Sequence, residues 1–323
     1  MAELNATHPN YLDWLKRRDP DGTPASIAEI MSVETPIIED AVVVEANGPL
    51  SHRTTVRSGL PAGTWRRLNY GVPVEKGKTK QITDAIGSLE TYAEVDKDLA
   101  DLNGNTAEWR LSEETAFIEG LAQTMSTTLI YGNTETDPEK FLGLTYRYND
   151  LTADNGRMVI DEGGSGADQT SIWGVVWGPQ SVHMTFPKGS MAGLKMEDLG
   201  QDTLSDAAGG YYEGYRTHYQ WKAGMVVRDW RQCTRIVLDT GTASSSSVLE
   251  LMAEAQNQIQ KPGAGRLVWY CNRTMKVRLD KEAIGKTNMA LSMQQQDNGG
   301  PVTMFWGNPI RLLESITNTE AAV

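Results

Sequence analysis

The most regular pattern of apolar positions along the chain lies in residues 105–132. Apolar side chains recur there every four residues, which is the spacing of one face of an α-helix; they are Phe117, Leu121, Met125 and Leu129, with Ile118 and Ala122 beside them. Asn105 and Gly132 suit the start and the left-handed end of such a helix. The pattern predicts a rod of about 25 residues, roughly 38 Å long at about 1.5 Å per residue. Its polar face would carry Glu113, Glu114 and Glu119.

Two segments before this helix are rich in β-branched and aromatic residues. They are "HRTTVRSGL" (52–60) and "TWRRLNYGV" (64–72), and a turn-forming Pro-Ala-Gly separates them. This order is typical of a β-hairpin. If the hairpin continues past Lys80 to residue 95, each side would reach roughly 50 Å at about 3.3 Å per residue. Because it contains few large apolar residues, we predict that it projects from the body of the protein.

The second half of the chain is predicted to be rich in strands. Strand-like runs occur at 171–178, 182–186, 218–230, 233–238, 266–271, 300–307 and 309–316. Ser247 is placed to cap an amphipathic helix in 248–260, and a further helix is predicted in 272–285. The first fifty residues contain two short helical patterns, 10–19 and 24–33, and are interpreted as an arm. The fold class is therefore α+β.

Length and composition narrow the class of protein. A chain of 323 residues can form one large domain or two smaller ones. Its two cysteines, Cys233 and Cys271, lie in apolar runs and are expected to be reduced core thiols. The sequence has neither the pattern of a signal peptide nor 18 consecutive apolar residues, so we expect neither secretion nor a membrane span.

Charge is distributed unevenly along the chain. The formal net charge of −12 argues against a surface that grips nucleic acid phosphates. Residues 53–80 nevertheless contain one acid, Glu75, and seven cations: Arg53, Arg57, Arg66, Arg67, Lys76, Lys78 and Lys80. From residue 84 to 119 the balance reverses, with ten acids against Lys97 and Arg110. A basic segment thus directly precedes an acidic one.

Several short motifs resemble sites of known chemistry but depart from them. "GVPVEKGKTK" (71–80) resembles a phosphate-binding loop, yet five residues instead of four separate its first glycine from Gly-Lys-Thr. A calcium loop starting at Asp96 or Asp101 lacks its ligand at Ala100 or Ser112. None of the four histidines has a second ligand at metal-binding spacing; they are His8, His52, His183 and His218. We therefore expect no nucleotide, metal or other cofactor, and no enzymatic activity.

Nine tryptophans in an acidic, strand-rich chain leave an alternative open. They could form a carbohydrate-binding face, or the protein could be a glycosidase, which would need two opposed carboxylates. Glu213 and Asp229 are the candidate pair. Packing of tryptophans in half-buried strands is the competing explanation.

The order of the predicted elements resembles the major capsid proteins of tailed bacteriophages, which share the HK97-like fold. The resemblance lies in "HRTTVRSGLPAGTWRRLNYGV" (52–72), "EVDKDLADLNGN" (94–105) and "FLGLTYRY" (141–148). Later, "YRTHYQWKAGMVVRDWRQCTRIV" (215–237), "RLVWYCNRTM" (266–275) and "FWGNPIRLLESITNTE" (305–320) are similar to runs in a subgroup of the family. Together these segments span nearly the whole chain.

The resemblance implies a subunit that assembles into the icosahedral shell around the viral genome. It implies an N-terminal arm (1–50), an extended loop (51–95), a peripheral domain (96–160) with its spine helix (105–132), a mainly axial domain (161–300) and returning C-terminal strands (301–323). The expected partners are copies of the chain in hexamers and pentamers, a portal, a separate scaffolding protein and a decoration protein. The expected location is the virion, after assembly in the host cytoplasm. The net charge would let double-stranded DNA slide instead of binding specifically, and no membrane contact is expected.

The charge pattern adds a hypothesis about contacts between subunits. A basic loop cannot neutralise many acids within its own hairpin, but it can lie along the acidic strand and helix of a neighbour. The seven cations of residues 53–80 would then face acids on a second copy. The candidate acids are Glu94, Asp96, Asp98, Asp101, Glu113 and Glu114.

Overall fold

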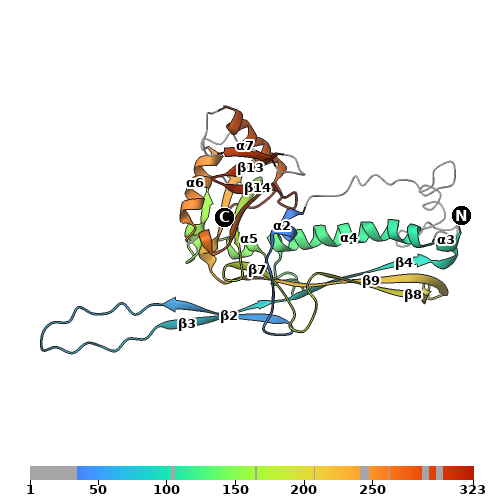
Figure 1. The fold of residues 1–323 in the computed structure, drawn as a ribbon, viewed down its shortest axis with the longest axis horizontal. Coiled ribbons are helices and arrows are strands. Elements are labelled where there is room, and N and C mark those ends of the chain that lie inside the picture. Colours follow the sequence, from blue (N-terminus) through green and yellow to red (C-terminus); the bar gives the residue numbers. More distant parts are fainter. Residues whose placement is uncertain are drawn as a thin grey trace.

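The computed structural model describes residues 35–102, 106–163, 166–206, 208–240, 247–260, 262–285, 291–295 and 301–323. Figure 1 shows a β-rich body from which two parts project in opposite directions along the longest axis of the molecule. We call one the spine arm, made of a long helix over three strands, and the other the extended loop, residues 51–85. The helices expected at 10–19 and 24–33, and the capping residue Asn105, lie outside the described residues.

The body is built around β6 (Gln169–Trp177), a strand in which every residue is buried. It pairs antiparallel with β10 (Cys233–Asp239) and with β11 (Arg266–Cys271). The sheet continues through β14 (Asn308–Leu312), β13 (Pro301–Phe305) and β12 (Leu291–Gln295), while β5 (Val159–Asp161) pairs with β10. Strands buried on both faces read as continuous apolar runs, which is why this part of the sheet could be predicted. Cys233 and Cys271 are buried free thiols in it, as expected.

Two helices belong to the body, α6 (Val248–Gln258) and α7 (Arg273–Gly285). In the segment of α6, the four apolar residues on one face of the predicted helix are all buried: Val248, Met252, Ala255 and Ile259. Ser247 is the N-cap residue of α6, as predicted, but the predicted capping hydrogen bond of its side chain is wrong. The Ser247 hydroxyl makes no capping bond and donates instead to Glu282 Oε2 at 2.6 Å, while Glu282 Oε1 accepts from the Val248 amide at 3.1 Å. A carboxylate from α7 therefore satisfies the start of α6.

The spine arm consists of α3 (Lys97–Asp101) and α4 (Thr106–Tyr131) with β4 (Gly87–Asp96), β8 (Leu194–Ser205) and β9 (Tyr211–Val227). β9 is the central strand and pairs antiparallel with β4 and with β8. Odd-numbered residues of β4 and β9 lie toward α4, where Ala93 and Tyr219 pack with Leu121. The polar strand β8 has no hydrophobic pattern, and sequence reasoning missed it.

β9 also connects the spine arm to the body. Its first part alternates in burial, whereas Ala223 to Val227 are all buried where the strand pairs with β7 (Val182–Phe186). β1 (Val43–Glu45) pairs parallel with β7 on the body side. Short helices complete the body: α2 (Pro36–Asp40), α5 (Leu144–Arg147), η1 (Gly156–Met158), η2 (Trp230–Gln232) and η3 (Pro262–Ala264). A single 17-residue strand thus carries the arm as a continuation of the core sheet.

The hairpin in the extended loop differs from the predicted one. β2 (Ser51–Gly59) pairs with β3 (Lys78–Ala85), and residues 64–72, the expected partner, form no strand. β4 belongs to the spine arm, so the hairpin ends at Ala85 and not near residue 95. Between the strands, residues 60–77 form a wide exposed tip, in which the Glu75 carboxylate accepts from the amides of Ala62 and Gly63 at 2.9 and 3.3 Å.

α4 confirms the predicted helix and corrects two of its details. Leu121, Met125 and Leu129 are buried, but Ile118 is exposed, whereas Glu113 and Glu114 are buried. Glu113 is buried because of its spacing along the helix. It lies four residues from Phe117 and eight from Leu121, on the face that continues to the buried Trp109. Gly132 does not adopt a positive φ. It is glycine because a Cβ there would lie 2.3 Å from the carbonyl oxygen of Phe141.

A buried ion pair fastens the C-terminal segment to the body. Arg235 Nη2 lies 2.8 Å from Glu320 Oε2, and both side chains are almost fully buried. Glu320 also accepts from the hydroxyls of Tyr131 and Ser171, and Arg235 donates to Ser171 and to the carbonyl of Tyr148 at 2.8 Å. One carboxylate therefore connects α4, β6, β10 and the C-terminal residues.

We expect Arg235→Met to lower the free energy of unfolding of the subunit by about 3–5 kcal/mol, because it leaves the Glu320 carboxylate buried without its cation. Equilibrium denaturation in urea measures this change. The double variant Arg235→Met/Glu320→Gln buries no charge and should recover part of the loss. A single variant as stable as the wild type would contradict this view of the network.

Candidate intersubunit surfaces

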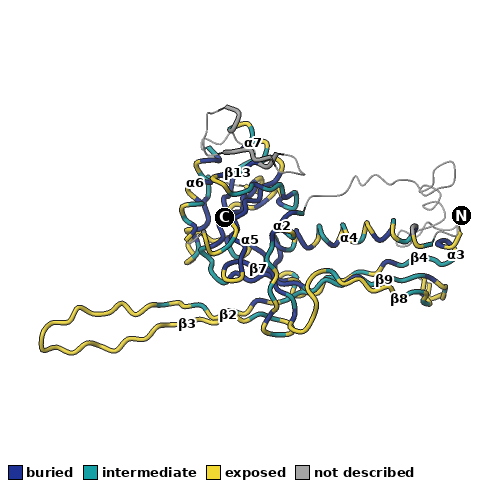
Figure 2. Tube along the Cα trace, in the orientation of Figure 1, coloured by how far each residue is buried: buried dark blue, intermediate teal, exposed yellow. Residues whose placement is uncertain are grey.

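The seven cations of the extended loop all lie on the surface: Arg53, Arg57, Arg66, Arg67, Lys76, Lys78 and Lys80. Figure 2 shows the tip of the loop as a continuous exposed segment. None of the seven forms an ion pair with an acid in the part of the chain that the structure describes. The basic segment therefore has no described counter-charge in its own subunit.

The tip of the loop also exposes large apolar side chains, which sequence reasoning did not select as contact residues. Trp65 and Val74 are fully exposed, at 102% and 100%, and four more are at least half exposed: Leu60, Leu68, Tyr70 and Val72. Apolar residues gathered on a projecting segment mark a surface that binds a partner. The signal in the sequence is the presence of Trp65, Leu68 and Val74 inside an otherwise basic segment.

The candidate acids fall into two groups. Glu94, Asp96, Glu113 and Glu114 are engaged or buried within their own subunit, whereas Asp98 and Asp101 are exposed. Glu94 Oε1 lies 2.7 Å from Arg216 Nη2, the Asp96 carboxylate accepts from the Asp98 amide at 2.8 Å, and the Asp101 carboxylate accepts from the Thr106 hydroxyl at 2.7 Å. The structure therefore does not gather the six acids into one exposed patch.

Glu114 is part of a buried polar group under α4. Its Oε1 accepts from the Thr217 hydroxyl at 2.8 Å and lies 3.7 Å from Arg110 Nη2. Arg110 also pairs with Asp198 of β8 at 2.7 Å. Burial, together with the neighbouring Glu114 carboxylate, raises the pKa of Tyr219 to about 12. These groups hold α4 onto the sheet of the spine arm and are not available to a neighbour.

The opposite face of that sheet carries a second polar network. Arg216 lies between Glu94 and Asp202, at 2.7 and 3.0 Å, and also over the ring of Tyr92. The His218 ring stacks on Tyr92 with a centroid distance of 4.4 Å. Exposed acids remain at the free end of the arm: Asp98, Asp101, Asp206 and Glu213. Further exposed acids lie along the strands of the arm, namely Glu90, Glu197 and Asp198.

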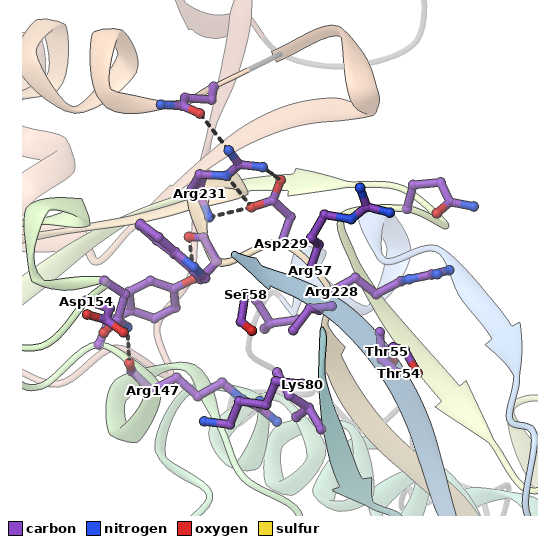
Figure 3. Close-up of a pocket in the computed structure, with 18 of the residues that line it drawn as sticks. Thr54, Thr55, Arg57, Ser58, Lys80, Arg147, Asp154, Arg228, Asp229 and Arg231 are labelled. Carbon is purple, nitrogen blue, oxygen red and sulfur yellow. Dashed lines mark hydrogen bonds and ion pairs between the residues drawn. The ribbon is translucent and has the colours of Figure 1, made fainter. Parts of the chain in front are cut away.

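A large cleft lies where the extended loop joins the body. It has a volume of about 1170 Å³ and is lined by β2 and β3 on one side and by residues 147–157 and 227–231 on the other. In Figure 3, Lys80 and Arg147 lie below the cavity and Arg57 and Arg231 lie above it. Arg147 is paired with Asp84, and Arg231 with Asp229, both at 2.8 Å.

Four cations lining this cleft have no acidic partner among the described residues: Arg57, Lys80, Arg157 and Arg228. The Arg157 guanidinium lies 4.9 Å from the ring centroid of Trp230. Two carboxylates, Asp154 and Asp229, line the same cleft, and Asp229 is paired with Arg231. The cleft is therefore mixed in charge, with an excess of cations between the loop and the body.

Beside this cleft, two histidines meet at the root of the loop. The rings of His52 and His183 are edge to face with a centroid distance of 5.8 Å. Burial, together with the neighbouring His52 and Arg228, lowers the pKa of His183 to about 4. Burial also lowers the pKa of His52 against the opposing effect of Asp84. Both rings are therefore neutral at pH 7.

The structure separates the two carboxylates of the glycosidase alternative. Glu213 lies near the start of β9 and hydrogen-bonds to Gln201 and Thr203, whereas Asp229 follows the end of that strand and binds Arg231. Sixteen positions along a strand correspond to roughly 50 Å, while a catalytic pair must lie within about 10 Å. These two residues do not form a glycosidase site.

Two further structural features bear on the possible functions. The described residues contain no group of three or more His, Cys, Asp or Glu side chains placed to bind a metal ion. None of the helices in the described ranges combines the length and the apolar character needed to cross a bilayer.

Comparison with known proteins places the chain among viral shell proteins. Residues 19–323 match the family model of the major capsid protein GP7. A chain in the near-atomic-resolution structure of bacteriophage Epsilon15 is 32% identical, with a TM-score of 0.76 over 100% of this chain and 99% of that one. The bacteriophage JBD30 capsid matches in fold, with 10% identity and a TM-score of 0.52 over 90% of this chain and 95% of that one. No curated protein matches.

The buried and exposed acids should respond differently to charge reversal. Glu114→Lys places an ammonium group beside Arg110 in a buried site, so we expect it to lower the free energy of unfolding by about 3 kcal/mol or more. Asp98→Lys changes an exposed residue and should stay within about 0.5 kcal/mol of the wild type. Denaturant titration of the full-length subunit compares them, and equal effects would refute the assignment of Glu114 to the interior.

The neutral His183 predicts a loss of stability in acid. Its pKa is about 4 in the folded chain against 6.5 for an ordinary histidine, so below pH 6.5 the unfolded state binds more protons and the free energy of unfolding falls as the pH decreases toward 4. His183→Leu removes this proton uptake. Its free energy of unfolding should fall less than that of the wild type between pH 7 and pH 5. Parallel pH profiles for the two proteins would disprove the prediction.

Proposed function

The chain belongs to the major capsid protein GP7 family and has the HK97-like α+β fold, so it is a shell-forming capsid subunit of a tailed bacteriophage; from its surfaces we propose that the extended loop of each subunit binds the spine arm of a neighbour. The family expected from the sequence is confirmed. The observation that carries the proposal is the set of seven exposed loop cations without a described acidic partner in their own subunit.

The positions of the charges favour a contact that joins the two ends of the molecule. The basic loop and the acidic end of the spine arm project in opposite directions from the body (Figure 1). Two different surfaces of one chain make a heterologous contact, which generates a ring when the rotation between subunits closes. Rings of this kind would be the hexamers and pentamers of the shell.

The internal contacts of the spine arm change which acids we propose for this interface. Glu113 and Glu114 are buried, and Glu94 is paired with Arg216, so none of them is the first choice. Asp98, Asp101, Asp206 and Glu213 are exposed toward the free end of the arm and replace them. Each exposed pair contributes only about 0–1 kcal/mol and weakens with salt. The strength of the contact would come from its repetition around the ring.

The finer roles follow from the same proposal. We assign residues 1–50 to an N-terminal arm, 51–95 to the extended loop, 96–160 to a peripheral domain, 161–300 mainly to an axial domain and 301–323 to returning strands. The shell would enclose double-stranded DNA, and its subunit charge of −12 would keep the DNA from adhering to it. Portal, scaffolding and decoration proteins are the proposed further partners, with assembly in the host cytoplasm and without enzymatic activity.

Reversal of loop charges tests the interface. We expect Arg66→Glu/Arg67→Glu to leave the unfolding midpoint of the unassembled subunit unchanged, because neither side chain has an ion pair among the described residues, and to lower the yield of particles at least tenfold. High salt should reduce the yield of wild-type particles in the same direction. Sedimentation and electron microscopy measure the assembly, and thermal unfolding measures the subunit.

The matched control is Lys188→Glu/Lys281→Glu, which makes the same change of charge on exposed residues of the body. It should assemble like the wild type. Normal particle yield from the loop variant, or an equal loss from the control, would contradict the proposed role of the loop charges.

A further inference from the structure

The spine arm contains an apolar hollow between its helix and its edge strand. This cavity of about 420 Å³ is lined by Leu89, Glu90 and Thr91 from β4 and by a stretch of α4 that includes Phe117, Gly120 and Leu121. Among the described strands, β4 pairs only with β9, so no described strand covers its other edge. The hollow therefore opens where a second chain can approach.

Gly120 is unusual at the wall of this hollow. It lies in the middle of the 26-residue helix α4, where glycine favours the helix less than any residue except proline. Its backbone does not require glycine, since its φ is not positive, and an added Cβ would meet no atom within 4 Å. The packing of the described residues gives no reason for the missing side chain. A side chain from another subunit that occupies the space beside residue 120 would explain why this position is glycine.

Trp65 has the complementary property. Its side chain is fully exposed at the tip of the extended loop. The tip points away from α4, on the far side of the body (Figure 1), so Trp65 cannot fill the hollow of its own subunit. Large aromatic side chains are the usual anchors of protein interfaces when they enter an apolar pocket. Within the described part of the chain, Trp65 is thus an exposed aromatic side chain without a pocket, and the hollow at Gly120 is a pocket that no side chain fills.

The charge near the hollow is less specific than its shape. Glu90 lines the hollow, but its carboxylate accepts from the side chains of Ser88 and Gln220 on the face of the sheet opposite α4. Arg66 and Arg67 follow Trp65 directly, and from a docked tryptophan they would reach this carboxylate only around the edge of β4 that no described strand covers. The apolar contact therefore carries the argument.

We propose that Trp65 of one subunit inserts into the hollow between α4 and β4 of a second copy, against Gly120. The proposal rests on the proposed function, because it names the residue and the pocket through which the extended loop binds the neighbouring spine arm. The missing side chain of Gly120 leaves room for the indole ring, and the apolar side chains of Leu89, Phe117 and Leu121 contact it.

A substitution that fills the hollow distinguishes a role of Gly120 in assembly from a role in folding of the subunit. Gly120→Leu introduces a better helix former into open space, so we expect the unfolding midpoint of the subunit to rise or stay unchanged while the particle yield falls at least tenfold. Thr115→Leu is the matched control, because Thr115 is an exposed residue on another face of α4 that does not line the hollow. Normal particles from Gly120→Leu would overturn the proposal.

Removing the Trp65 side chain provides a second test of the insertion. Trp65→Ala should lower the particle yield at least tenfold, and Trp65→Phe, which keeps an aromatic ring, should recover part of it. Particles of Trp65→Cys/Thr124→Cys should form disulfide-linked multimers on oxidation, because Thr124 lines the hollow and both native cysteines are buried. Normal assembly of Trp65→Ala, or no cross-link in intact particles, would refute the insertion.

The outcome is distinguishable from failure of the proposed function. If Trp65→Ala assembles normally while Arg66→Glu/Arg67→Glu does not, the loop binds a neighbour by charge and the insertion is wrong. If neither variant affects assembly, the loop contact itself is wrong.

Discussion

The tip of the extended loop, residues 60–77, is not stabilised by the described part of the subunit that carries it, and the proposed assembly depends on this constraint. Residues 60–77 have no paired strand, and they expose both cations and large apolar side chains, including Trp65. A two-stranded hairpin alone is marginally stable in water. The apolar side chains of such a segment are removed from water only when the surface of another molecule covers them. The requirement for a partner is therefore part of the fold.

The body and the spine arm provide what a loop of this kind needs, which is a rigid support. β9 runs without interruption from the arm into the core sheet, so the two parts share one strand. The Arg235–Glu320 pair connects the body strands to α4 and to the C-terminal residues. Two acids of the arm have a similar role, since Glu94 pairs with Arg216 between β4 and β9 and Glu114 holds α4 onto the sheet. What remains exposed at the free end is a smaller and more specific set of charges.

The loop root differs from this rigid support in its chemistry. His52 and His183 lie together beside Asp84 and Arg228, and the adjoining cleft is lined by cations. Polar groups at such a junction cost free energy unless they are fully paired. The base of the loop therefore contributes a stability that depends on pH through these histidines. In the proposed contact, the tip depends instead on the apolar surface of the neighbour.

The sequence by itself determined the elements whose pattern is local. The four-residue spacing of Leu121, Met125 and Leu129 determined α4, and continuous apolar runs determined strands such as β6, because periodicity reports which face is buried. The uneven charge of residues 53–119 also followed from the sequence alone. Only the tertiary structure decided which strand pairs with β2, that Glu113 and Glu114 are buried, and that Trp65 and Gly120 are both open. These facts depend on contacts between residues far apart in the chain, and such contacts leave no periodic signal.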